Sequence, residues 1–136
     1  MGTKRIKSVD QARELLVNAI EDRGEDYKYE YEEGSVICKY VHWDGKPGCI
    51  IGHVLEQMGR LDEVEHDATL NTSGVDTLHH EIGLFSGVEK ETLFEGLQSA
   101  QGEQDSGGTW GKALQAFDWA VEHERKYRTA EAEAVA

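Results

Sequence analysis

The chain has 136 residues and a formal net charge of −13, from 27 acidic and 14 basic side chains. This length suits one domain with its own core, and 38% apolar with 30% charged residues is typical of a folded protein. A strongly negative surface repels phosphate groups, so we expect no direct nucleic-acid binding. No apolar run of membrane-spanning length and no export signal occur, so we expect a cytoplasmic protein without membrane contact.

The first predicted element is a helix over residues 9–23. Ser8 and Gln11 have the spacing of a capping box, in which each side chain bonds an amide at the start of a helix. Apolar residues follow at helical spacing, and Gly24 is a natural stop. Residues 1–7 are expected to be a flexible N-terminus.

A small β-hairpin is predicted over residues 27–42. Residues 27–32 alternate tyrosines with charged residues, which is the pattern of a strand with one covered face. Residues 35–42 are rich in side chains that favour strands. The two segments are separated by the plausible turn Glu33-Gly34.

A buried helix is predicted from about residue 49 to residue 58, after a segment dense in turn formers. Gly52 lies inside it and costs about 1 kcal/mol of helix stability relative to alanine. Close packing against another backbone would offset that cost.

The remainder of the chain continues the helical pattern. The expected features are a short helix near 61–66, a helix capped by Ser73, a helix after a second capping-box match at Ser86–Glu89, a last helix from Thr109 to about Arg128, and a flexible tail over 129–136. The predicted fold is therefore a mainly α, compact bundle of about five helices in one globular domain over residues 8–128.

Cys38, His42, Cys49 and His53 form the pattern C-x3-H-x6-C-x3-H. Thiolate and imidazole groups suit zinc, and the turn between the two pairs could bring them together. The spacing is not that of a zinc finger, and many unrelated chains match such a pattern by chance. Zinc is the cofactor in this hypothesis, and no cofactor is expected in the others.

Cys49 and His53 also allow a second hypothesis, a cysteine-dependent hydrolase or transferase. Cys49 lies where a helix should begin, and free amides at a helix start stabilise a thiolate. The sequence identifies neither an oxyanion site nor a group to orient His53. The alternative is that Cys49 is a small buried residue and His53 a partly buried imidazole.

Trp119 falls off the apolar stripe of the last helix, among polar neighbours. An exposed tryptophan in polar surroundings is a candidate contact with a partner protein, and partial burial is the alternative. The negative charge favours a partner with a basic surface.

Two segments of the chain form a combined pattern. One runs from Gly45 to Leu55, and the other carries Gln101, Gln104, Asp105, Gly107, Trp110, Gly111, Ala113 and Leu114. Together they resemble small uncharacterised proteins of actinobacteria and their phages over about residues 8–125. The resemblance implies an intracellular protein and assigns no chemistry to these residues. The leading hypothesis is thus a non-enzymatic acidic protein-interaction domain, such as a phage-encoded factor acting on a host protein.

Overall fold

The computed structural model describes residues 4–35 and 37–135. Within these residues the fold is mainly helical, as predicted, and its only strand-like pairings are two isolated bridges. The helices are α1 (Val9–Arg23), α2 (Ile50–Gln57), α3 (Asp62–Glu65), α4 (Ala68–Asn71), α5 (Val75–Ile82), α6 (Lys90–Asp105) and α7 (Trp110–Val135). Two of them, α3 and α4, are single turns that sequence patterns resolve poorly.

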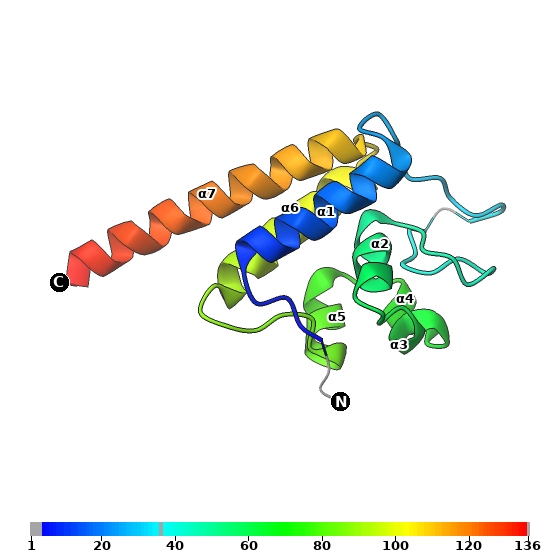
Figure 1. Cartoon of the computed structure of the whole chain (residues 1–136), viewed down its shortest axis with the longest axis horizontal. Coiled ribbons are helices and arrows are strands. Elements are labelled where there is room, and N and C mark those ends of the chain that lie inside the picture. Colours follow the sequence, from blue (N-terminus) through cyan, green and yellow to red (C-terminus); the bar gives the residue numbers. More distant parts are fainter. Residues whose placement is uncertain (1–3, 36, 136) are drawn as a thin grey trace.

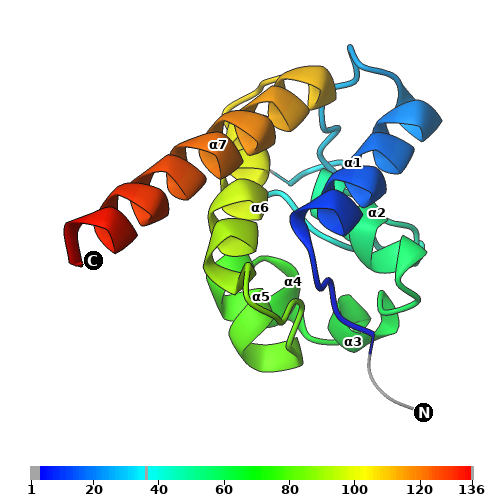
Figure 2. The ribbon, with the colours of Figure 1, turned by 60° about the vertical axis from the view of Figure 1, so that its left-hand side comes forward.

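The two longest helices, α6 and α7, pack against each other as an antiparallel pair (Figures 1 and 2). Helix α1 runs alongside α7 and contacts both members of the pair, and α2 packs against both α1 and α6 (Figures 1 and 2). Helices α3, α4 and α5 form the end of the molecule near the N-terminus, whereas the C-terminal part of α7 projects past its neighbours (Figure 1). None of the helices described here has both the length and the apolar character that crossing a membrane requires.

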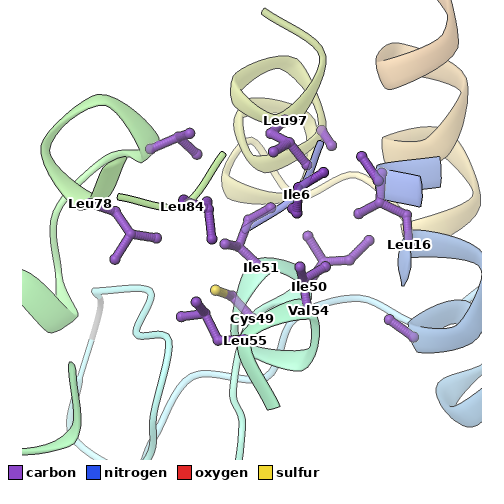
Figure 3. Close-up of a cluster of buried hydrophobic side chains, with 14 of the residues drawn as sticks. Ile6, Leu16, Cys49, Ile50, Ile51, Val54, Leu55, Leu78, Leu84 and Leu97 are labelled. Atoms are coloured by element: carbon purple, nitrogen blue, oxygen red, sulfur yellow. The ribbon is translucent and has the colours of Figure 1, made fainter. Parts of the chain in front are cut away.

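Helix α2 lies in the centre of the hydrophobic core (Figure 3). Ile50, Ile51, Val54 and Leu55 are all fully buried, because the helix is covered on nearly every side. Leu97 of α6 is fully buried in the same cluster, and Leu114 of α7 packs against it partly buried. The expectation that the apolar stripes of several helices share one interior is confirmed.

The start of α1 is confirmed, with one difference in the cap. The Ser8 hydroxyl oxygen accepts a hydrogen bond from the Gln11 amide at 3.1 Å. The Gln11 side chain accepts from the amide of Lys7 at 2.9 Å, one residue before the position that a capping box would use. The first bond satisfies an amide that the helix leaves free, and the second ties the residue before the cap to the first turn.

The capping box predicted at Ser86–Glu89 does not form. Helix α6 begins after Glu89, without a side-chain cap. The Glu89 carboxylate instead accepts a hydrogen bond from the Val9 amide of α1 at 2.9 Å and another from Arg125 of α7 at 3.0 Å. A carboxylate at a helix N-terminus is stabilised by the free amides there, so Glu89 joins three helices rather than capping its own.

The hairpin predicted over residues 27–42 is absent from the described residues. Residues 39–42 pair forward instead, with the segment just before α2, through the antiparallel bridge between Val41 and Pro47. The buried Asn71 side chain takes the other edge, accepting from the Val41 amide and donating to the Val41 carbonyl at 2.8 Å each. These partners satisfy the backbone that residues 27–32 were expected to bond.

The chain ends also differ from the sequence-based expectation. Ile6, inside the segment expected to be flexible, is fully buried and forms a parallel bridge with Phe85. Its amide donates to Leu84 and its carbonyl accepts from Ser86, both at 2.9 Å. At the other end, α7 continues beyond Arg128 to Val135.

Candidate functional site

The segment from Gly45 to Leu55 and the segment from Gln101 to Leu114 meet at the start of α2. The side-chain oxygen of Gln104 accepts hydrogen bonds from the Ile50 amide at 2.8 Å and from the Trp110 indole at 3.1 Å. Nearby, a Cβ atom on Gly52 would clash with the carbonyl oxygen of Tyr40. The glycine therefore allows the close backbone packing that its place inside a helix predicts. These residues hold the core together at the junction of α2, α6 and α7.

Cys49 occupies the N-cap position of α2, and its side chain forms no capping hydrogen bond. Its side chain is 1% exposed, so a substrate in solvent cannot reach the sulfur. Burial raises the pKa of the thiol to about 12, although the amides of Gly52 and Ile51 act in the opposite direction. The predicted effect of the helix N-terminus on Cys49 is present, but desolvation outweighs it, and the thiol is neutral at pH 7.

His53 lies one turn further along α2 and is 5% exposed. Its ring packs edge-to-face against Trp110, with centroids 5.1 Å apart. Nδ1 is 4.0 Å from a carboxylate oxygen of Asp22, whereas the buried Nε2 has no hydrogen-bond partner. Burial lowers the pKa of His53 to about 4, with a smaller effect from the Arg23 charge. The imidazole is therefore neutral and part of the core.

Cys38 and His42 are engaged elsewhere. Desolvation, followed by the nearby Asp105, raises the pKa of the half-buried Cys38 thiol to about 11. The Tyr29 hydroxyl accepts a hydrogen bond from the Lys39 amide at 3.0 Å and shares a second one with Nε2 of His42 at 2.7 Å. One of the two ring nitrogens with which His42 could bind a metal is thus already hydrogen-bonded.

The four residues of the C-x3-H-x6-C-x3-H pattern do not converge. Throughout the described part of the chain, no three histidine, cysteine, aspartate or glutamate side chains are grouped so that they could hold a metal ion. The pairs were expected to meet through a strand and a helix, but Cys49 and His53 face the core. The four side chains are consequently not assembled into the zinc site that the sequence pattern suggested.

Arg60 is a buried charged residue, which often marks a functional site, and the sequence pattern did not select it. It is 3% exposed, and its guanidinium donates to the Glu63 carboxylate and to the Ile82 carbonyl. It also donates to the carbonyls of Lys4 and Gly83 at 2.8 Å each. All of its donors are used to join the N-terminal segment to the end of α5, so Arg60 is structural.

Large apolar side chains on the surface are the other feature of functional interest. Trp119 is 65% exposed on α7, in agreement with its position off the core stripe, and its indole stacks on His123 with centroids 5.0 Å apart. Trp43 is 88% exposed and was not among the predicted contacts. The sequence feature that could have predicted this exposure is the position of Trp43 immediately before the turn formers Asp44-Gly45, which places it outside any packed helix or strand.

Comparisons of the chain with protein-family models, with curated proteins and with solved structures found no match.

Proposed function

We propose that this chain is a non-enzymatic, acidic protein-interaction domain. The observation that carries the proposal is a contrast in exposure: the candidate nucleophile Cys49 is buried, whereas Trp43 and Trp119 project into solvent. Exposed tryptophans are expensive to hydrate and are frequent anchors of protein interfaces. Their positions on separate elements offer a partner two distinct contacts.

The charge of the chain supports the kind of partner. A net charge of −13 favours association with a basic protein surface and disfavours nucleic acid. The resemblance to actinobacterial and phage proteins adds the finer proposal that the partner is a host protein. The neutral, buried thiol of Cys49 gives less support to a cysteine-dependent enzyme.

The test is a capture experiment with matched variants. The immobilised wild-type chain should retain a protein from a lysate of host cells, and Trp119→Ala or Trp43→Ala should weaken that retention. Both side chains are exposed, so the variants should keep the wild-type circular dichroism spectrum and unfolding midpoint. If the wild type and the double variant retained the same proteins in the same amounts, the proposal would be wrong.

A further inference from the structure

Trp43 lies on a loop tip whose backbone is fixed. The His42 amide donates to the Lys46 carbonyl, and the Gly45 amide donates to the His42 carbonyl, both at 2.9 Å. The Trp43 amide itself donates to the Glu32 carboxylate at 2.8 Å. The indole is thus held out in solvent by a closed turn, and a partner that covers it would not have to order the backbone first.

A surface hollow of about 210 Å³ adjoins this tryptophan. Trp43 and Val41 line it from the loop, and Glu65 and His66 line it from the end of α3. The Glu65 carboxylate approaches the turn closely, because a Cβ atom on Gly45 would lie 3.1 Å from Oε1. An aromatic ring and a carboxylate therefore border one small cavity.

The charge around the hollow is unbalanced. Two acidic side chains, Glu32 and Glu65, line the hollow together with one basic side chain, Lys39. Glu32 is paired with Lys39 at 2.9 Å, whereas the described residues offer Glu65 only His66, at 4.0 Å. Lys39 therefore offsets the charge of Glu32, whereas Glu65 has no lysine or arginine partner among the described residues and favours a cationic group from outside.

Trp119 has neither a free indole face nor an unpaired carboxylate beside it. One face of its indole is already covered by the ring of His123, with an angle of 6° between the planes. The neighbouring carboxylate of Glu122 forms an ion pair with Lys126 at 3.0 Å. Trp43 and Glu65 therefore make the better site for a cation.

We propose that the hollow beside Trp43 receives an arginine side chain from a basic segment of the partner protein. A guanidinium group is planar, so it can stack on the indole while its N–H groups donate to the Glu65 carboxylate. A lysine ammonium group carries the same charge but is not planar, so it cannot stack flat on the indole and donate hydrogen bonds to Glu65 in the same way. This inference rests on the proposed function and specifies the surface and the chemistry of its partner.

The test is an NMR titration of the ¹⁵N-labelled full chain with an acetylated peptide of alternating arginine and glycine. The amide signals of Trp43, Gly45 and Glu65 should shift together and saturate. A peptide of the same length with lysine in place of arginine should bind about threefold or more weakly, as the loss of guanidinium stacking implies. Equal binding of the two peptides would overturn the assignment of arginine.

Three variants locate the site. Trp43→Ala and Glu65→Gln should each reduce the affinity for the arginine peptide about threefold or more. The matched control is Tyr127→Ala, which removes an exposed aromatic side chain from α7 and should leave peptide binding unchanged. Core amide signals that stay in place show that each variant is folded. Shifts centred on α7, or unchanged binding by Trp43→Ala, would overturn the site. Those results would not decide the proposed function, which the capture experiment tests separately.

Discussion

The buried imidazole of His53 should make the folded chain less stable in mild acid. The pKa of His53 in the folded state is lowered to about 4, from the 6.5 of an exposed histidine, chiefly by burial. Between these two values the unfolded chain binds a proton that the folded chain does not. Stability is therefore complete above pH 6.5 and decreases as the pH falls towards 4.

The size of this effect follows from the two pKa values. At 1.36 kcal/mol for each pKa unit, the complete loss of unfolding free energy is about 3 kcal/mol. At pH 5 the unfolded state is almost fully protonated and the folded state is mostly neutral, so about 2 kcal/mol should already be lost relative to pH 7.5. Glu32, Glu63 and Glu89 have lowered pKa values and stabilise the fold above pH 4.5, so their contributions are lost mainly at lower pH.

Urea unfolding at pH 7.5, 6 and 5 measures this loss, with His53→Leu as the comparison. Leucine has a similar volume, does not titrate, and removes the buried nitrogen that lacks a partner. The wild type should lose about 2 kcal/mol more than His53→Leu between pH 7.5 and pH 5. Every other histidine is present in both proteins and cancels in the difference. Parallel stability curves for the two proteins would refute the reasoning.

Three further predictions follow from packing. Gly52→Ala should lower the free energy of unfolding in urea by about 2 kcal/mol or more, because the added Cβ would clash with a backbone carbonyl oxygen. Gly102→Ala is the control, because Gly102 lies in α6 with open space around it, and it should raise the free energy of unfolding by up to about 1 kcal/mol. Equal effects of the two substitutions would contradict the close approach at Gly52. Arg60→Leu should lower the free energy of unfolding in urea by about 3 kcal/mol or more, because it leaves one carboxylate and three carbonyl groups without their donor. A decrease of less than about 1 kcal/mol would show that water hydrates these groups in the variant. Iodoacetamide at pH 8 should modify Cys49 at least about tenfold more slowly than a free thiol, with Cys38 the faster of the two; rapid labelling of Cys49 in the native protein would restore the nucleophile hypothesis.

The same structural reasoning explains which parts of the fold the sequence predicted. The bounds of α1 follow from a local cap, a helical repeat and a glycine stop, all within one segment. Helix α2 was predicted to within a residue at each end, because its apolar residues repeat at helical spacing after a clear turn. Both signals depend only on neighbours along the chain, and such local signals survive folding.

The predicted contacts of the candidate site were less accurate. Cys49 at the N-cap and His53 belong to one helix, which was predicted to be buried, but how completely its neighbours cover these two side chains depends on the tertiary packing. Burial raised the pKa of the thiol and lowered that of the imidazole, so the features that suggested chemistry became features of the interior. The sequence had offered burial of Cys49 and His53 as the alternative, but it did not show that desolvation would outweigh the effect of the helix N-terminus.

The amino-acid sequence by itself determined a mainly helical chain, the extents of α1 and α2 and the strongly negative charge. Only the tertiary structure decided where Glu89, Asn71 and Arg60 bond, because each satisfies backbone groups that lie far away along the chain. Unsatisfied backbone groups must find partners wherever the packed chain supplies them, and a sequence pattern reports only the nearby ones. For the same reason Trp43 emerged as a candidate contact only when the closed turn and the Glu65 carboxylate were seen around it.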